Sequence, residues 1–504
     1  MRTINHILAT ALVSLAAFVQ LSAQQATTTH HHYKLVDLGT FGGPNGFLAG
    51  FTLPINLRGV VTECSDSAVF DSNFPTQNPY FGGDPYIQVA YEWANGVRSK
   101  LRTLHGGTNA CTQWINDYGT VVGASDMGEI DPLTGLRQIR AVLWNSRGKI
   151  HDLGTLGGSG SVAWAVNNAG QVTGNALNEI PDDFNLNMDF GIVGATQTHA
   201  FLWQNGVMRD LGTLGGPDSG PFAINERGQV VGLSATNSFV NPTTGLPTID
   251  PFFWDGNRMV DLGSLGGTYG VAVDLNNRGQ VIGNALLEGD EIQRAFLRPG
   301  RDGKMIELPT LGGTRNEAKA INNAGDVTGA ARFAGDALSH PVLWAKGKVI
   351  DLGVVPGDLC AEGMAINSKR QIVGFSNHDH CGPPHAHGFL WENGVIFDLN
   401  GLISNATTLT VIEGVRITER GEIAGNALTP EGNQHGVVLI PCDEEHLDLE
   451  GCDYGTVEQS GAAQARPARH LNRTNSDRSQ APMRRHASSI PRLGPPLIGE
   501  QSPR

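Results

Sequence analysis

The chain repeats one stretch of sequence along most of its length. Residues 199–216 read HAFLWQNGVMRDLGTLGG, residues 141–158 read AVLWNSRGKIHDLGTLGG and residues 251–267 read PFFWDGNRMVDLGSLGG. Aligned on the acidic residue of "DLG", the eight copies are spaced 44 to 63 residues apart and fall at Asp37, Asp152, Asp210, Asp261, Glu307, Asp351 and Asp398, with Lys100 in the weakest copy. Such a unit buries its apolar face only against its neighbours, so the repeat predicts one continuous array.

A second signature, I-N-x-x-G-x-V-x-G, accompanies each copy, as in residues 224–232, INERGQVVG. An Asn at the start of a type I turn accepts backbone hydrogen bonds, and a Gly three residues later takes positive φ. The Asn position is held by Asn56, Asn116, Asn167, Asn225, Asn276, Asn322 and Asn367, with Thr418 in the last copy. These asparagines are therefore predicted to be structural and not catalytic.

Each copy provides four short strands and no helical periodicity. The sequence also contains 66 Gly, which suits tight turns. This pattern predicts an all-β fold, a β-propeller of about eight four-stranded blades. Residues 33–39 match only a fourth strand and residues 435–440 only a third. Pairing these two segments would complete the last blade with the N-terminal strand and close the ring without an exposed edge.

The segments HAFLWQNGVMRDLGTLGG and NNAGQVTG resemble the HAF repeat of probable extracellular bacterial proteins, named for the tripeptide seen here as His199-Ala200-Phe201. The resemblance covers about residues 33–440, although the tripeptide is intact only once. It implies export and repetition, and it transfers no catalytic residue.

Segments outside the repeats differ in composition. Arg2 precedes an apolar run too short to span a bilayer, so residues 1–23 are predicted to be a signal peptide. Residues 24–32 form a flexible His-rich arm, residues 33–442 the propeller of HAF-like repeats, and residues 443–504 a disordered tail rich in Arg, Pro and Ser. We expect a secreted or periplasmic monomer without a membrane span. The whole chain is acidic, with a net charge of −14, which argues against nucleic acid as a partner.

Six cysteines suit an oxidising compartment. Cys442 and Cys452 lie close around a turn, and Cys360 and Cys381 fall within one copy. Elimination leaves Cys64 with Cys111, although spacing alone does not determine connectivity. For Cys360 and Cys381 we expect Cα atoms roughly 4.4–6.8 Å apart.

Several polar groups invite a chemical interpretation. The residue before "AF" is His199, His340, His387 or His435 in four copies, close to the "DLG" acid, but no Ser or Cys nucleophile recurs beside it, so a structural hydrogen bond is predicted. His378, His380 and His385 in NHDHCGPPHAH have spacing that suits a transition metal. The acids of residues 182–189 suit Ca²⁺. The alternative for both is a solvated loop, and we expect no cofactor.

The copies differ mainly between their second and third strands. These connections are long in the first four copies: residues 65–89, 126–140, 177–199 and 236–250. All four are predicted to emerge on the face of the "TLGG" crossings, and insertions on one face favour a binding side. The candidate ligand-binding residues are Tyr80, Phe81, Asp84, Tyr86, Asp131, Asp182, Asp183, Phe184 and Asp189. The alternative is that the connections cover blade edges, with their aromatic rings inside the fold.

Two functions of different class remain. The first is a secreted binding or interaction module for an extracellular glycan, peptide or protein partner. The second is a secreted propeller hydrolase or lyase with a metal at the central channel. Enzymes of the second kind usually gather acids or histidines from different blades at the channel mouth, whereas the repeated polar residues here lie on later strands, away from the channel, which favours the first. No P-loop, GxSxG, HExxH or dinucleotide motif appears in the sequence.

Overall fold

The computed structural model describes residues 27–48, 52–74, 78–81, 85–182, 196–242, 245–300, 303–378, 381 and 387–460. The described chain is mostly β-strand, with short 3-10 turns such as η1 (Pro79–Phe81) and η3 (Leu399–Leu402). This confirms the all-β class. The predicted signal peptide lies outside the described residues.

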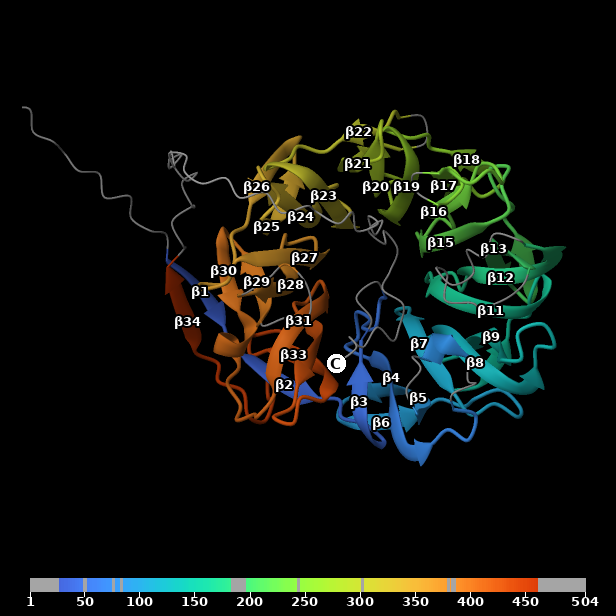
Figure 1. Ribbon diagram of the computed structural model, residues 1–504. Helices are drawn as coiled ribbons and strands as arrows, with labels where there is room; N and C mark the ends of the chain where they lie inside the picture. Colours follow the sequence, from blue (N-terminus) through green and yellow to red (C-terminus); the bar gives the residue numbers. More distant parts are fainter. Residues whose placement is uncertain are drawn as a thin grey trace, which may run out of the picture.

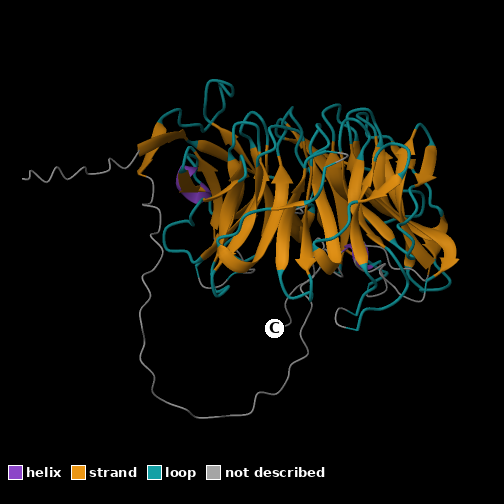
Figure 2. Ribbon diagram, turned by 90° about the horizontal axis from the view of Figure 1, so that it is seen from above, coloured by secondary structure: helices purple, strands orange, loops and turns teal. Residues whose placement is uncertain are grey.

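Within the described chain the strands form antiparallel groups of four, which we call blades and number along the chain. Figure 1 shows the blades arranged around a common centre, and Figure 2 shows that their strands lie in one layer of even height. The strands of blades 1 to 4 are β3 (Gly42–Phe47), β4 (Val61–Phe70), β5 (Tyr86–Ala94) and β6 (Val97–Lys100); β7 (Ala110–Ile115), β8 (Val121–Ile130), β9 (Arg137–Trp144) and β10 (Ile150–Asp152); β11 (Gly157–Val166), β12 (Val172–Pro181), β13 (Thr196–Gln204) and β14 (Val207–Asp210); and β15 (Ser219–Ile224), β16 (Val230–Ala235), β17 (Ile249–Trp254) and β18 (Met259–Asp261).

The later blades follow the same order. Their strands are β19 (Gly266–Leu275), β20 (Val281–Leu287), β21 (Gln293–Arg298) and β22 (Ile306–Glu307); β23 (Gly312–Ile321), β24 (Val327–Phe333), β25 (Ser339–Ala345) and β26 (Lys348–Asp351); β27 (Cys360–Ile366), β28 (Ile372–Asn377), β29 (His387–Glu392) and β30 (Val395–Asp398); and β31 (Thr410–Ile417), β32 (Ile423–Leu428), β33 (Gln434–Pro441) and β2 (Tyr33–Asp37). Single parallel bridges, Ile249–Tyr269 and Gln293–Arg315, join blades 4, 5 and 6 into one sheet.

The repeated Asn holds its own turn and the next blade together. The Oδ1 atom of Asn225 accepts the backbone N–H groups of Arg227 and Gln229 at 3.0 and 3.1 Å, and Gly228 takes φ +71° as the turn requires. The Nδ2 atom of Asn225 donates to the Asn276 carbonyl of the next turn at 3.1 Å. The same link to the next turn recurs from Asn56, Asn116, Asn167, Asn276, Asn322 and Asn367. The predicted structural role is confirmed.

The core lies between neighbouring blades. Trp144 of β9 is fully buried in one cluster with Ala90 and Leu101 of blade 1, and its indole N–H donates to the Arg102 carbonyl at 2.8 Å. Such a side chain contributes about 2–3 kcal/mol through its apolar burial. Packing between neighbouring blades therefore helps to hold the array together.

The two ends of the array meet. β2 pairs antiparallel with β33, in register from Tyr33 opposite Pro441 to Asp37 opposite Val437. The predicted pairing is confirmed. Blades 1 and 8 also share a core, in which Leu38 and Tyr91 pack with Val415 and Val438.

Regular structure continues beyond the repeats, on both their N-terminal and their C-terminal side. β1 (Thr27–His31) pairs with β34 (Thr456–Ser460), where a flexible arm and a disordered tail were expected. His30 is buried, stacks on Tyr33 with ring centroids 5.4 Å apart, and approaches Glu392 to 3.3 Å. Neither segment belongs to a repeat, so the repeat pattern gave no signal for their pairing.

Three disulfides connect the described cysteines. Cys64 of β4 joins Cys111 of β7, Cys360 joins Cys381 and Cys442 joins Cys452, with Cα–Cα distances of 4.9, 5.2 and 5.5 Å. The expected pairs and the expected distance for Cys360 and Cys381 are confirmed. The first disulfide links blade 1 to blade 2.

A buried acid occupies the junction between blades 1 and 8. The second strands of the other blades carry a glycine here, because a Cβ at Gly232 would lie 2.0 Å from the Gly220 carbonyl oxygen. Blade 1 has Glu63 instead, only 1% exposed, and its Oε2 accepts the Tyr91 hydroxyl at 2.5 Å. Burial raises the pKa of Glu63 to about 8, against the opposing effect of hydrogen bonds from Tyr91 and the Gly436 backbone. The carboxyl is therefore mostly protonated at neutral pH.

Replacing Asn225 with Ala is expected to destabilise the fold. The change removes two turn bonds and the bond to the next blade, and it leaves buried backbone groups without partners. We expect a loss of about 1–3 kcal/mol in urea unfolding. The control is the exposed Asn257→Ala, expected to stay within about 0.5 kcal/mol of wild type. Equal effects of the two changes would contradict the structural role.

Replacing Glu63 with Gln is expected to change how stability depends on pH. The folded pKa is raised above the ordinary 4.5, so the contribution of Glu63 is most favourable below pH 4.5. It is lost as pH rises and levels off above about 8, by at most about 1.4 kcal/mol per pH unit. E63Q should therefore unfold at higher urea than wild type at pH 8, with the difference shrinking towards pH 5. Exposed Glu431→Gln is the control, and parallel pH profiles for wild type and E63Q would contradict this assignment.

Candidate functional site

The long connections of the first four blades are partly strand. β4, β8 and β12 are each ten residues long and extend beyond the positions where the repeat ends its second strand. Asp126, expected in a loop, lies in β8, where it is buried and its Oδ1 accepts the backbone N–H groups of Thr108 and Asn109 at 2.7 and 2.8 Å. The insertions of blades 1 to 3 therefore lengthen these blades on one face, whereas that of blade 4 follows the six-residue β16 as a loop.

Apolar side chains gather at the tips of these extended hairpins. Phe239 is 81% exposed and Leu133 is 70% exposed, whereas Phe and Leu side chains are mostly buried in folded proteins. The exposed set at the tips, called the apolar tips below, comprises Val69, Phe70, Phe74, Ile130, Leu133, Ile180, Phe239 and Val240. Among the described residues of the later blades, the corresponding connections expose only Leu338 from this class. Among the described connections, the exposed apolar side chains are thus concentrated in blades 1 to 4.

Two predicted ligand-binding aromatics are inside the fold. Tyr80 and Phe81 of η1 are 4% and 2% exposed, and they pack in one cluster with the Cys64–Cys111 disulfide. The Tyr80 hydroxyl accepts a hydrogen bond from Gln113 Nε2 at 2.8 Å. Their large apolar area favours burial over contact with water, so the structure corrects this part of the prediction. Tyr80 and Phe81 instead follow the alternative prediction, in which the connections cover blade edges with their aromatic rings inside the fold.

The other predicted residues divide into two groups. Tyr86 is partly exposed and stacks on exposed Phe70, with ring centroids 4.8 Å apart. Asp131 is buried in a turn, where it accepts the Ser159 hydroxyl at 2.7 Å, so it is not available to a ligand. Asp182 is half-buried. The remaining predicted residues, Asp84, Asp183, Phe184 and Asp189, lie outside the described residues.

The predicted metal residues are not brought together within the described chain. His378 is exposed, and His380 and His385 lie outside the described residues. The described ranges contain no group of three His, Cys, Asp or Glu side chains placed to hold a metal ion. The transition-metal and Ca²⁺ hypotheses therefore gain no support here.

The predicted pairing of His with the "DLG" acid is present in three blades. His199 Nδ1 lies 2.9 Å from Asp210, His340 Nδ1 2.8 Å from Asp351, and His435 Nδ1 3.0 Å from Asp37. In each case the acid stands on the fourth strand, and the hydrogen bond from His helps to hold its pKa low, against burial. The pair ties the outer strands together.

The other five blades differ: blades 1, 2 and 5 carry Val89, Arg140 and Arg294 in place of His, and blades 4 and 7 vary the partners. His387 of blade 7 contacts Asp358 at 2.9 Å and not the acid of its own hairpin. Blade 4 places Asp250 near Asp261, and burial followed by that neighbour raises the pKa of Asp250 to about 6. A recurring catalytic dyad would not tolerate such variation, so the structural role of the pair is supported.

A row of acids on the inner strands was not expected from the sequence. Glu317, Glu362 and Glu413 occupy the same register on β23, β27 and β31, each preceding the residue opposite the second-strand glycine. These strands lie towards the common centre (Figure 1). Lys319 Nζ bridges the first two, 3.0 Å from Glu317 Oε2 and 3.7 Å from Glu362 Oε2. We call these four residues the inner charged row.

Burial and the charge of Lys319 shift the pKa values of the three glutamates in different directions. The ammonium of Lys319 holds the pKa of Glu317 low. Burial raises the pKa of Glu362, and burial opposed by the Asn426 amide raises that of Glu413 to about 7. The row therefore contains an ionised pair and a carboxyl that titrates near neutrality.

The inner charged row has a visible sequence signal. Glu precedes the strand end by the same interval in NEAKAIN, AEGMAIN and IEGVRIT, whereas the corresponding residues of blades 2 to 5 are Cys111, Val162, Gly220 and Val271. When the copies are aligned on the turn Asn and not on the acid of "DLG", the three glutamates fall at one position.

Comparisons with known proteins identify propeller proteins and no family. No family model matches the chain, and no curated protein does. Among solved structures, the β-propeller domain of the Trilobed protease from Pyrococcus furiosus is similar with a TM-score of 0.40 and 10% identity, covering 74% of this chain and 97% of that one. The Pyrococcus horikoshii acylaminoacyl peptidase gives a TM-score of 0.39 and 12% identity, with 74% of this chain and 56% of that one covered. Similarity at this level carries no information about activity.

Removing the cation of the inner charged row is expected to destabilise the protein at neutral pH. In Lys319→Met, the Glu317 and Glu362 carboxylates lose their partner in a mostly buried site, at a cost of about 3 kcal/mol at pH 7. The loss should shrink at pH 5, because the carboxylates then take up protons, and in E317Q/K319M. Urea unfolding measures both effects. Exposed Lys348→Met is the control, and a K319M variant as stable as K348M would contradict the ion pairing.

Proposed function

We propose that this chain is an exported, closed eight-bladed β-propeller that acts as a binding module for an extracellular peptide or protein partner. Eight groups of four strands and the pairing of β2 with β33 support the closed ring. The HAF-type repeats and three disulfides support export. No described helix is long and apolar enough to cross a membrane.

The apolar tips carry this proposal. Exposed apolar patches on one face usually mark an interaction surface, since water disfavours them and folding does not require them. Here they occur on the inserted hairpins of blades 1 to 4, while the repeat itself is complete without them. Phe70 stacked on Tyr86 and exposed Phe74 provide aromatic area of the kind that anchors a peptide or protein partner. A glycan remains the alternative ligand for the same rings.

The inner charged row supports a second function, a hydrolase or lyase acting at the central channel. Glu413, with a pKa of about 7, has the protonation behaviour of a general acid. The sequence analysis included a metal ion in this second function, but the described residues contain no group of side chains placed to bind one. Loss of hydrolysis of an arrayed ligand in E413Q, with capture retained, would favour this function.

Replacing four of the apolar tips is expected to abolish ligand capture and leave the fold intact. The variant is F70S/F74S/L133S/F239S, and its matched control is V97S/V207S/I350S, which removes exposed apolar side chains from fourth strands. Both sets are exposed, so urea unfolding should change little. On peptide and glycan arrays, wild type and control should capture the same ligands and the tip variant none. Capture that survives in the tip variant, or no capture by wild type, would contradict the proposal.

A further inference from the structure

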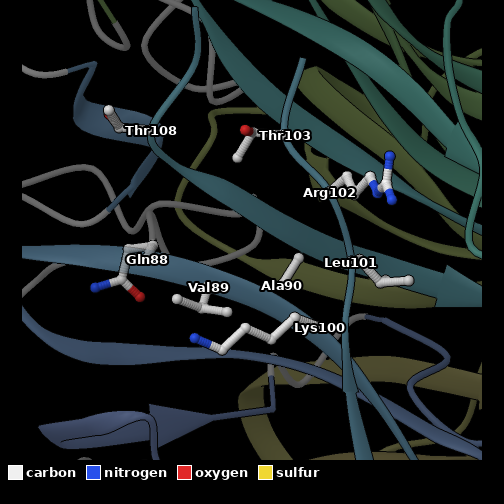
Figure 3. Close-up of a pocket in the computed structure, with 8 residues that line it drawn as sticks. All are labelled: Gln88, Val89, Ala90, Lys100, Leu101, Arg102, Thr103 and Thr108. Atoms are coloured by element: carbon white, nitrogen blue, oxygen red, sulfur yellow. The ribbon is translucent and has the colours of Figure 1, made fainter. Parts of the chain in front are cut away.

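A cavity lies beside the crossing from blade 1 to blade 2. Its volume is about 410 Å³, within the range of small-ligand sites. Figure 3 shows the residues that line it: Gln88, Val89, Ala90, Lys100, Leu101, Arg102, Thr103 and Thr108. Lys100 and Arg102 carry two positive charges, and no lining residue is acidic.

In blade 5 the same place is occupied by side chains of the blade itself. In blade 5, Arg294 of the third strand donates to Glu307 of the fourth at 2.8 Å and to the Thr314 carbonyl of the next blade at 2.6 Å. Blade 1 carries Val89 and Lys100 at the two positions that pair as Arg294 and Glu307. The large cation of the third strand and the acid of the fourth are both missing there.

The missing acid also changes the crossing. In blade 3 the Asp210 carboxylate accepts the Gly212 backbone N–H at 2.7 Å, and Gly212 takes φ +74°. Lys100 cannot accept this bond, Arg102 stands in place of the glycine, and His105 lengthens the crossing by one residue. The cavity therefore opens where the repeat lacks its own carboxylate.

The groups around the cavity leave their charges and acceptors available. Lys100 Nζ lies 4.5 Å from the Phe41 ring centroid, and no carboxylate in the described chain pairs with Lys100 or Arg102. The hydroxyls of Thr103 and Thr108 donate to the Gly107 carbonyl and to Asp126. The Thr108 oxygen also accepts from Asn109 Nδ2 at 3.1 Å, and each hydroxyl oxygen has a lone pair left for one more donor.

Two acids near the cavity are already hydrogen-bonded. Asp66 Oδ1 accepts Gln88 Nε2 at 2.6 Å, and Asp126 Oδ2 accepts the Thr108 hydroxyl at 3.0 Å. Their charge opposes a dianion such as phosphate more strongly than a monoanion. The cavity thus suits one carboxylate with hydroxyl groups beside it.

We propose that this cavity binds a sugar acid, with Lys100 holding its carboxylate where the other blades place their own acid and Arg102 adding positive charge on the other side of the cavity. The oxygens of Thr103 and Thr108 accept hydrogen bonds from the ring hydroxyls. The site is separate from the apolar tips and goes beyond the proposed function, because it selects a small ligand by charge.

The test measures binding of three small probes by titration in nuclear magnetic resonance. Methyl β-D-glucuronide should bind wild type at least about tenfold more tightly than the neutral methyl β-D-glucoside, since a charge-assisted pair is lost in the latter. N-acetylalanine, a carboxylate from the peptide source, should also bind less tightly than the glucuronide because it lacks the hydroxyls. K100M should weaken glucuronide binding at least about tenfold, and exposed K348M should leave it unchanged.

A second variant keeps the test independent of folding. V89R/K100E rebuilds the pair seen as Arg294 and Glu307, so it should fold with wild-type stability, fill the cavity and abolish glucuronide binding. Equal affinity for glucuronide and glucoside, equal affinity for N-acetylalanine, or glucuronide binding that survives V89R/K100E would overturn the proposal, as would no binding by wild type. The F70S/F74S/L133S/F239S variant should bind glucuronide normally, which separates failure here from failure of the proposed function.

Discussion

A single side-chain amide at each turn organises this structure. The Asn Oδ1 atom closes its own turn, and its Nδ2 atom reaches the carbonyl of the next turn, so every such Asn from Asn56 to Asn367 links two blades. Asparagine is suited to this role because its amide donates and accepts at once. Blades contact mainly their neighbours, so stability accumulates along the array as it does in other repeat proteins. The first and last blades then need a partner as well, and the pairing of β2 with β33 joins the two ends of the array.

Regular repeats make departures from the pattern informative. Glu63 stands where the other second strands need glycine, and it is buried at the junction of the first and last blades. Lys100 and Arg102 stand where the repeat has an acid and a glycine, and a cavity opens beside them. Glu317, Glu362 and Glu413 replace neutral residues on three inner strands. A buried polar or charged group costs stability unless it is hydrogen-bonded or paired, so these positions are where function is to be sought.

The features that could be predicted from sequence follow from local chemistry that recurs. Turn asparagines, four-stranded units and the complementary ends all leave a periodic trace, and the spacing of Cys360 and Cys381 within one copy pointed to their disulfide. Features without a period were missed. The pairing of β1 with β34 joins two segments outside the repeats. Tyr80 and Phe81 have the composition of a ligand site, but their burial depends on how the insertion packs against the Cys64–Cys111 disulfide, which no local pattern reveals.

The closed ring is the central claim of this account, and hydrogen exchange measured by mass spectrometry tests it most directly. If the ring is closed through β2 and β33, amides of residues 33–37 should exchange as slowly as those of residues 434–441, and both should become exposed together in rising urea. Rapid exchange of residues 33–37, with residues 434–441 still protected, would show an open array and contradict the account.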